Sequence, residues 1–451
     1  MFWLEDPARP EPRPPLHGTE RADLVVVGGG YTGLWTALRS KERYPDRDVV
    51  LVEAGDCGDQ ASGRNGGFAS ASLTHGFGNG TARWPEELSE LDRIGAQNVA
   101  AIGETIDRYG IDCGWEETGE LMVASAPHQV KELAGLCEEM RSAGHDPELL
   151  DEAGVRAQVA SPTYLSGIWD RRGTAMVEPA RLAWGLRDAC LDAGVRIYER
   201  SPVTGLGRDG AAMLARTSTG EVRAGRVALA TNAFPPLLRR LRLMSVPVYD
   251  YVLMTEPLTA EQLSSIGWQN RQGVGDAANQ FHYYRLTRDN RVLWGGYDAV
   301  YYYGSRIRHE LEQSEVTHGL LAEHFFATFP QLRGVRFTHR WGGVIDTCTQ
   351  FAAFFGTAYD GRVGYALGYT GLGVAATRFG ADVMLDLLHG EDTERTRLRM
   401  VREKPLPFPP EPARYAGVQL TRWAMSHADT HGGRRNLWLR AMDRLGLGFD
   451  S

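Results

Sequence analysis

The chain has 451 residues and a formal net charge of −8, and its basic side chains are scattered among acidic ones, which disfavours nucleic acid as a partner. This length predicts two domains with room for a large cofactor, and the 43% of hydrophobic and 24% of charged residues are ordinary for a folded protein. Neither a secretory signal nor an apolar run of about 18 residues is visible, so we expect a cytoplasmic protein with no transmembrane segment.

The first predicted elements are a strand, a glycine-rich turn, a helix and a second strand. Gly28, Gly30 and Gly33 follow the apolar residues 24–27 as a GxGxxG sequence, and Glu53 ends the second strand. The first glycine permits the turn, the second lets the backbone approach a pyrophosphate, and the third lets the helix pack closely on the strand. The Glu53 carboxylate would accept hydrogen bonds from ribose hydroxyls and repel a 2′-phosphate. The pattern predicts a dinucleotide other than NADP; the alternative is a glycine-rich turn without a ligand.

A second glycine-rich segment, SGRNGG at residues 62–67, begins about ten residues after the second strand. A loop in this place would return toward the same phosphates and reach the far end of the cofactor. The alternative is a surface turn whose polar residues have no special role.

Further elements follow in chain order. Apolar periodicity predicts helices at residues 86–109, 127–143, 180–193 and 306–329. Between residues 247 and 298, tyrosine-rich segments with alternating side chains and turn residues indicate antiparallel strands. A strand, a glycine turn and another helix are predicted within residues 361–390, and the proline-rich segment from residue 405 opens a tail with two short helices.

Three segments, GGGYTGLWTAL, VEA and ASGRNGGF, resemble in their order and spacing the D-amino-acid-oxidase-like superfamily of FAD-dependent amine oxidoreductases. Within it, the chain is most similar to the gamma-glutamylputrescine oxidoreductase branch. The later segments RWGGVID and GYTGLGV resemble the family's segment beside the flavin and its late glycine loop. The resemblance therefore covers most of the chain.

The resemblance implies an α/β fold, in which a Rossmann-like FAD-binding domain of the glutathione-reductase and D-amino-acid-oxidase type carries an inserted α+β substrate domain with an antiparallel sheet. We expect the FAD-binding domain to be assembled from residues 20–110, 155–245 and 338–400. The substrate domain is expected at residues 111–154 and 246–337, and a C-terminal helical tail at residues 401–451.

The same resemblance assigns the cofactor contacts, with FAD bound noncovalently. Arg64 and Asn65 would make polar contacts near the isoalloxazine ring, and Val203 would contact the adenine through its backbone. The helix after the late glycine loop would direct its N-terminal N–H groups at the pyrimidine edge of the flavin, where negative charge accumulates on reduction. The expected cofactor-binding residues are Gly28, Gly30, Tyr31, Thr32, Gly33, Glu53, Ala54, Ser62, Gly63, Arg64, Asn65, Gly66, Gly67, Val203, Thr231, Asn232, Gly343, Gly371, Leu372, Gly373 and Val374.

Two departures from the family concern the substrate and the flavin linkage. Relatives that oxidise D-amino acids or glycine carry an arginine for the substrate carboxylate, but Ile345 stands at that position here, which disfavours a free α-amino acid. The cysteine that binds flavin covalently in sarcosine-oxidase-like relatives falls near Gly343, and the nearby Cys348 keeps a covalent link open as an alternative. The five cysteines form no CxxC pair and no cluster with metal-ligand spacing, so we expect reduced thiols and no metal.

The predicted reaction is the oxidation of a primary or secondary amine to an imine by hydride transfer to flavin N5, followed by hydrolysis. Oxygen or another carrier would then accept the electrons. An aromatic pocket suits a cationic amine, and alternation along a strand places Tyr249 and Tyr251 on one face. The candidate substrate-pocket residues are His75, Tyr251, Tyr284, Trp341 and Asp346, with Tyr249, His282 and Tyr283 in the same aromatic set. The alternatives are that the rings form sheet core, that the histidine is structural and that Asp346 caps a turn.

Two other functions stay open. One is an FAD-dependent oxidase or dehydrogenase of an N-substituted or D-amino acid, and the other is a flavin-binding protein without catalysis. The chain has no GxSxG sequence, which disfavours a hydrolase. The sequence does not indicate an oligomeric state.

Overall fold

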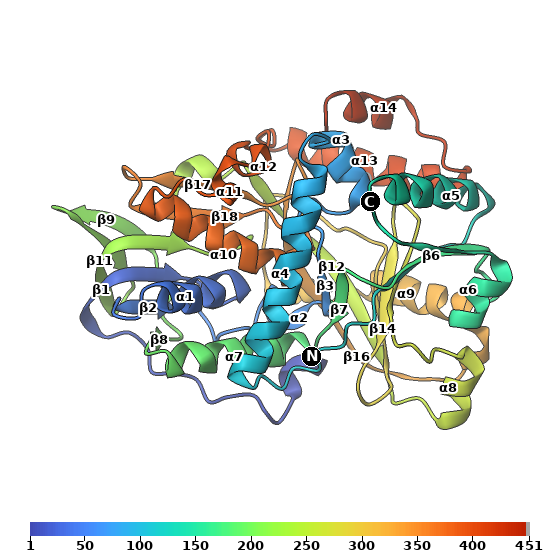
Figure 1. Ribbon diagram of the computed structural model, residues 1–451, viewed down its shortest axis with the longest axis horizontal. Coiled ribbons are helices and arrows are strands. Elements are labelled where there is room, and N and C mark those ends of the chain that lie inside the picture. The colour runs from blue at the N-terminus through green and yellow to red at the C-terminus, as the bar shows by residue number, and fades with distance from the viewer. Residues whose placement is uncertain (448–451) are drawn as a thin grey trace.

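Two large sheets organise the protein, and each forms the centre of one half of the molecule (Figure 1). The computed structural model describes residues 1–447. The last four residues of the predicted tail, 448–451, lie outside the described residues.

The first sheet is built around a parallel core in the order β18-β11-β1-β2-β8. Its central strands read as continuous apolar runs because helices or loops cover both of their faces, and Val25, Val26 and Leu51 are fully buried. β17 adds to one edge in the antiparallel direction, and the hairpin of β9 and β10 pairs with β11. The strands are β1 (Gly18–Val27), β2 (Val49–Val52), β8 (Arg196–Tyr198), β9 (Gly205–Asp209), β10 (Ala212–Arg216), β11 (Gly220–Leu229), β17 (Phe354–Ala358) and β18 (Val363–Leu367).

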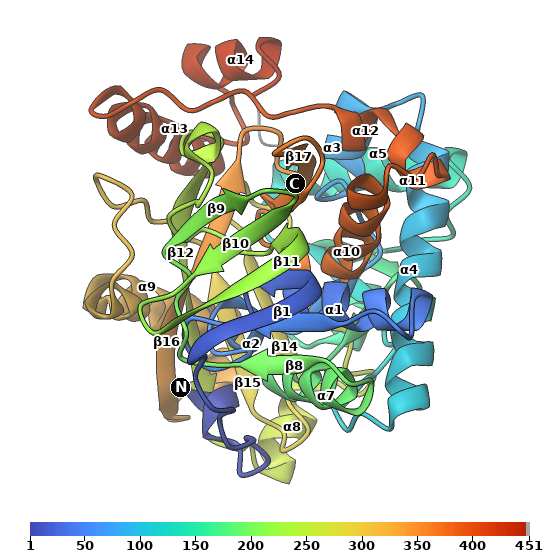
Figure 2. The ribbon, with the colours of Figure 1, turned by 90° about the vertical axis from the view of Figure 1, so that its left-hand side faces the viewer.

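Helices α1 (Tyr31–Arg43), α7 (Pro179–Asp192) and α10 (Gly373–His389) pack beside one another along one side of this sheet (Figure 2). The long helix α4 (Leu88–Tyr109) packs against α10. α4 has an apolar face whose buried residues include Leu91 and Ile102, and its left-handed Gly110 ends the helix. Buried side chains of α1, α4, α7 and α10 contribute to the largest hydrophobic core of the molecule.

The second sheet is almost entirely antiparallel, with the order β16-β12-β15-β14-β13-β4-β6-β5, and β13 and β4 are its parallel neighbours. Helix α9 (Glu315–Thr328) packs on β12 and covers one face. The strands are β4 (Glu120–Ala124), β5 (Glu148–Leu150), β6 (Ser166–Asp170), β12 (Ser245–Thr255), β13 (Gly273–Asp276), β14 (His282–Leu286), β15 (Val292–Gly296) and β16 (Phe337–Cys348).

The predicted α/β fold, with a parallel cofactor sheet and a second, antiparallel sheet, is confirmed. The pairing of two strands does not follow the predicted domain boundaries. β6 and β16 pair within the second sheet, whereas the sequence places them in the cofactor domain, within residues 155–245 and 338–400. We therefore propose a substrate domain that includes β6 and β16.

The helix predicted at residues 306–329 begins later than expected. Residues 306–314 form a loop with a short 3-10 turn at His309–Glu312. Ser314 then caps the helix by accepting a hydrogen bond from Thr317 N at 3.2 Å, which fixes its first residue as Glu315.

The remaining elements include β3 and β7, which form a separate two-stranded sheet. These elements are η1 (Phe2–Glu5), α2 (Ala61–Arg64), β3 (Phe68–Ser70), α3 (Phe77–Arg83), α5 (Pro127–Ser142), α6 (Glu152–Gln158), β7 (Thr174–Met176), η2 (Arg239–Leu241), α8 (Ala260–Ile266), η4 (Pro330–Leu332), α11 (Glu394–Arg397) and α12 (Arg399–Arg402).

The C-terminal tail crosses the top of the molecule in the view of Figure 1 as α13 (Ala413–Thr430) and α14 (Leu437–Arg444). Polar contacts attach it to the second half. Arg422 forms an ion pair with Asp298 at 2.6 Å, and Asp429 accepts hydrogen bonds from the backbone N–H groups of Asn279 at 2.9 Å and Gln280 at 3.0 Å. Within residues 1–447, none of the helices has the length and apolar character needed to cross a membrane.

Candidate active site

A cavity of about 1370 Å³ is lined by both halves of the protein and by the tail. At one end its wall consists of the turns that follow the strands of the first sheet. At the other end, side chains of the second sheet and of α13 and α14 form the wall. We call these the cofactor end and the substrate end.

The cofactor end begins at the turn between β1 and α1, where steric contacts require glycine. Gly28 has a φ of +113°, and a Cβ there would lie 2.3 Å from the carbonyl oxygen of Ala230. A Cβ at Gly33 would lie 1.8 Å from the carbonyl oxygen of Gly28, and one at Gly30 would lie 2.9 Å from Ser62 Oγ. The structure thus bears out the tight turn and the close helix packing that the GxGxxG spacing predicts.

Two helices begin at the wall of this cavity. α1 follows Gly30 and α10 follows Leu372, and neither of these two residues caps its helix with a side-chain hydrogen bond. The N–H groups in the first turn of a helix lack intrahelical partners, and the helix dipole favours an anion beside them. One of them, Tyr31 N, donates to Ser62 Oγ at 2.9 Å. The donor set and the space left by the glycines fit a dinucleotide diphosphate.

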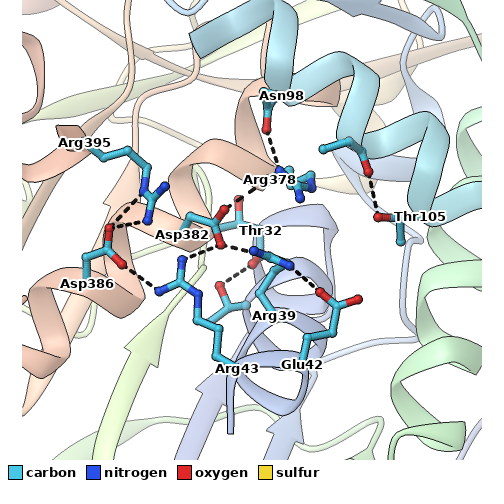
Figure 3. Close-up of polar contacts among 12 residues, drawn as sticks. Thr32, Arg39, Glu42, Arg43, Asn98, Thr105, Arg378, Asp382, Asp386 and Arg395 are labelled. Atoms are coloured by element: carbon cyan, nitrogen blue, oxygen red, sulfur yellow. Dashed lines mark hydrogen bonds and ion pairs between the residues drawn. The ribbon is translucent and has the colours of Figure 1, made fainter. Parts of the chain in front are cut away.

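A cluster of ion pairs fastens α1 to α10 (Figure 3). Arg43 lies 2.6 Å from Asp386 and 2.7 Å from Asp382, while Arg39 pairs with Asp382 at 2.9 Å. Arg395 completes the cluster at 2.8 Å from Asp386, whose side chain is fully buried. Burial opposes ionisation of Asp382, but Arg39, Arg43 and Arg378 outweigh it and lower the pKa of that carboxyl. The cluster joins the C-terminal halves of α1 and α10 and so holds the two helices side by side.

Glu53 lies where the sequence predicts an acidic residue, at the end of β2 and in the cavity wall. Its carboxylate accepts hydrogen bonds from Gly29 N at 2.5 Å and Gly55 N at 2.7 Å. Burial raises the pKa of this carboxyl above its usual value, although these N–H groups oppose the change. The residue therefore also fixes the shape of the glycine turn.

The SGRNGG segment folds as the short helix α2 and a tight turn, and the Asn65 side chain is bound within it. The Asn65 amide donates to the carbonyl oxygens of Ala61 at 2.9 Å and Ser62 at 3.0 Å, and its Oδ1 accepts from Gly67 N at 2.8 Å. The side chain thus stabilises its own loop, and its polar contact near the flavin ring stays a prediction. Asn65 still lines the cavity.

Arg64 also lines the cavity, and its guanidinium is engaged by the protein. It forms an ion pair with Glu312 at 2.7 Å, and its Nε donates to the carbonyl oxygen of Asp59 at 2.6 Å. This pair links the cofactor loop to the segment before α9.

Most of the predicted cofactor residues come together in the wall of this one cavity. Gly33, Gly63 and Gly67 do not, because they lie behind the wall in close backbone packing; a Cβ at Gly63 would lie 2.2 Å from Gly58 O and one at Gly67 2.1 Å from Val177 O. The residues that line it are Gly28, Gly30, Tyr31, Thr32, Glu53, Ala54, Ser62, Arg64, Asn65, Gly66, Val203, Thr231, Asn232, Gly343, Gly371, Leu372, Gly373 and Val374.

Three predicted substrate-pocket residues lie in the core, away from the cavity. Tyr251 faces α9 from the far side of the sheet, with its hydroxyl donating to the carbonyl oxygen of Leu311 at 2.7 Å. Tyr284 packs on Trp294 with ring centroids 4.4 Å apart. Trp341 is buried, and its Nε1 donates to Arg64 O at 2.9 Å. The prediction that these rings line the pocket is corrected in favour of the alternative that they form core.

His75 and Asp346 do line the cavity. Burial lowers the pKa of His75 to about 4, so its ring is neutral at pH 7. Asp346 accepts a hydrogen bond from Gly368 N at 2.5 Å, and burial raises the pKa of its carboxyl to about 7. Asp346 therefore holds the late glycine loop in place, as its turn-capping alternative predicts.

Sequence reasoning missed Asp250 and passed over Tyr283 when the pocket residues were chosen. Both line the substrate end, since alternate residues of β12, including Val248, Asp250 and Val252, face the cavity. The available signal was an aspartate between two tyrosines in a strand, in the sequence YDY. Ile345 also lines the cavity, whereas Cys348 does not; its Sγ donates to Ala352 O at 3.2 Å.

Comparison with known proteins gives the family. The family model described as "FAD dependent oxidoreductase" matches residues 23–387. The chain is 35% identical to gamma-glutamylputrescine oxidoreductase of Escherichia coli (strain K12), covering 84% of this chain and 86% of that protein. It is 28% identical to the probable oxidoreductase OrdL of Haemophilus influenzae, covering 84% and 85%.

Solved structures agree in fold. Glycine oxidase from Geobacillus kaustophilus superposes with a TM-score of 0.69 at 20% identity, covering 83% of this chain and 96% of that one. The resemblance that the glycine-rich segments indicate is therefore confirmed, and so is FAD as the cofactor.

Proposed function

The chain belongs to the family of FAD-dependent oxidoreductases, and from that premise we propose that it oxidises a primary or secondary amine to an imine, which water then hydrolyses. Bound FAD supplies the acceptor for the two electrons that leave the carbon beside the nitrogen. The protein contributes a site that holds cofactor and amine together and excludes bulk water.

We assign the cofactor contacts to the residues that line the cofactor end. The uncapped N-terminus of α1 would bind the diphosphate, and Glu53 would accept hydrogen bonds from the ribose. The uncapped N-terminus of α10 would direct N–H groups at the flavin, where they favour negative charge without having to reorganise. Because Cys348 lies outside the cavity wall, we propose noncovalent binding.

One observation carries the choice of an amine. Ile345 lines the cavity at the position where amino-acid oxidases of the resembled family place an arginine, so the wall is apolar there and offers no charge to a substrate carboxylate. The name of the relative from Escherichia coli denotes an amine derived from putrescine, which points in the same direction. The electron acceptor would be oxygen or another carrier.

The runner-up is oxidation of an N-substituted or D-amino acid, as the name of the glycine oxidase neighbour illustrates. That substrate would need a cation for its carboxylate. The purified protein, titrated without oxygen with putrescine derivatives, N-methyl amino acids and D-amino acids, separates the two. We expect amines without an α-carboxylate to bleach the flavin absorbance and to yield an aldehyde or ketone. Bleaching by amino acids alone would replace the proposal with the runner-up, and no bleaching by either class would leave a flavin-binding protein without amine oxidation.

A further inference from the structure

Asp250 stands at the boundary between the two ends of the cavity. It belongs to the face of β12 that lines the cavity, and its register partner on β16 is Gly343. Tyr249 and Tyr251 point to the opposite face, into the core under α9. Gly343 in turn approaches the cofactor loop, since a Cβ there would lie 3.9 Å from Arg64 Cβ. The carboxylate is therefore presented beside the residues assigned to the flavin.

Tyr283 fixes this carboxylate in place. Its ring lies between two glycines, because a Cβ at Gly66 would be 2.6 Å from Tyr283 Cε2 and one at Gly295 would be 2.7 Å from its Cζ. The hydroxyl donates to Asp250 Oδ2, and Asp250 Oδ1 accepts from Tyr251 N at 2.9 Å. Gly66 belongs to the cofactor loop and Gly295 to the second sheet, so the ring spans both parts of the site.

The carboxylate of Asp250 has only neutral hydrogen-bond partners within residues 1–447. Two other acidic residues of the wall have cationic partners, Asp59 with Arg9 at 2.8 Å and Asp298 with Arg422 at 2.6 Å. Glu53, Glu120 and Asp346 also have only neutral partners, but Glu53 and Asp346 hold glycine turns of the cofactor end through backbone N–H groups. Burial raises the pKa of Asp250 to about 6, against the hydrogen bonds from Tyr283 and the Tyr251 backbone. A buried carboxylate without a cation favours a ligand that brings a positive charge.

The arginine side chains of the wall already have acidic partners. Arg64 is paired with Glu312, Arg422 with Asp298, and Arg414 lies 3.5 Å from Glu411. His75 is neutral at pH 7 because burial lowers its pKa to about 4. Within the described chain, the wall thus offers a ligand carboxyl groups without a cationic partner, Asp250 among them, whereas its arginines are already paired with acids.

We propose that Asp250, positioned by Tyr283, binds the ammonium group of the substrate at the flavin end of the substrate pocket and so selects amines whose reacting carbon carries no carboxylate. This inference rests on the proposed function. Tyr283 lies against Gly66, and Asp250 is paired in register with Gly343. An ammonium group bound to Asp250 would therefore lie where the cofactor loop meets the second sheet. A substrate carboxylate on the neighbouring carbon would be repelled by Asp250 and would meet Ile345.

The test uses a cation that the enzyme cannot oxidise. tert-Butylamine is protonated at pH 7 and has no hydrogen on the carbon beside nitrogen, and tert-butanol is its neutral counterpart. Isothermal titration calorimetry of the flavin-loaded protein compares the two. We expect the wild type to bind the cation about tenfold or more tightly than the alcohol. Asp250→Asn, which keeps the shape and an acceptor for Tyr283, should abolish this preference.

Two further variants make the result specific. Asp107→Asn changes an exposed aspartate of α4 and should keep the wild-type preference. Tyr283→Phe keeps the ring but removes the hydroxyl, and we expect about a threefold weaker preference because Asp250 loses its donor. If Asp250→Asn fails to retain flavin, the preference for tert-butylamine over tert-butanol is compared between Tyr283→Phe and the wild type instead.

Outcomes for the two proposals are separable because neither probe is a substrate. No preference for the cation in the wild type, or an undiminished preference in Asp250→Asn, would overturn the role of Asp250 even if amines bleach the flavin. A preference that depends on Asp250 would support the role even if no amine of the substrate panel bleaches the flavin, and the proposed reaction would then fail alone.

Discussion

The two ends of the cavity are built in different ways. At the cofactor end the wall contains glycines whose Cβ atoms would clash, and the N-termini of two helices that ion pairs fasten side by side. At the substrate end the wall is mostly side chains, contributed by β12, β14 and the tail. A backbone site tolerates few replacements and serves one cofactor. A side-chain site can change its ligand without changing the fold.

The largest effect is expected from Gly28→Ala at the cofactor end. The new Cβ would lie 2.3 Å from Ala230 O, at a φ of +113°. Strain and overpacking together should cost about 3 kcal/mol or more in the free energy of unfolding. We expect loss of flavin from the purified protein and a lower midpoint of urea unfolding.

Gly135→Ala is the matched control. This glycine lies in α5 with no atom near its Cβ position, so alanine should stabilise the protein by roughly 0.5–1 kcal/mol. If Gly28→Ala unfolds at the wild-type urea concentration and keeps its flavin, the cofactor end is not fixed by its backbone.

The next effect is expected from Asp386→Ala, which removes one partner of the buried cluster in Figure 3. Arg43 and Arg395 would lose the fully buried carboxylate between them, although Arg43 keeps Asp382, and we expect a cost of about 3 kcal/mol. Thermal unfolding and flavin retention measure it. Asp392→Ala removes the exposed partner of Arg397 and should leave both unchanged. Equal effects of the two substitutions would contradict the claim that the ion-pair cluster stabilises the packing of α1 on α10.

A smaller, pH-dependent effect is expected at the substrate end from Glu120→Gln. Burial raises the pKa of Glu120 from 4.5 to about 7 in the folded protein. The folded state therefore binds the proton more tightly than the unfolded state, and this contribution to stability is lost as the pH rises from 4.5 through 7. We expect the melting temperature of the variant to fall less than that of the wild type between pH 5 and pH 8. The exposed Glu138→Gln should follow the wild type; an identical pH profile for Glu120→Gln would count against the prediction.

The smallest effect on stability is expected from Arg422→Ala in the tail. Its pair with Asp298 is partly exposed, so the free energy of unfolding should change by about 1 kcal/mol or less. The substrate end would lose a contact that holds α13 against the second sheet, and we expect KM for an amine to rise about threefold with flavin content unchanged. Arg440→Ala, on an exposed position of α14, is the control. A loss of flavin in Arg422→Ala would contradict the expectation that the tail affects the substrate end and not the cofactor end.

The same contrast explains what could be predicted from the sequence. The places of Gly28 and Gly33 in the turn after β1, and of Glu53 at the end of β2, could be predicted because their spacing follows from one local unit of strand, turn and helix. Tyr251 was misplaced because alternation says which residues of a strand share a face, but not which face is core. That choice is made by α9, which packs on β12 from far along the chain. Asp250 was missed for the same reason.

The tail shows a second limit. Trp438 and Met425 line the substrate end only because α13 and α14 fold back over the second sheet. Their composition predicts short helices and says nothing about where these dock. β6 and β16 were assigned to the other domain because strand pairing over long sequence separations leaves no local signal.

The most direct measurement is the anaerobic bleaching of bound flavin by a matched pair of compounds: a primary alkylamine and the α-amino acid that carries the same alkyl chain. The visible absorbance of the wild-type protein is followed after each is added without oxygen. We expect the amine to bleach the flavin and the amino acid to leave it oxidised, because under our proposal a carboxylate beside the nitrogen would be repelled by Asp250 and would find no cation at Ile345. Bleaching by the amino acid and not by the amine would contradict the account.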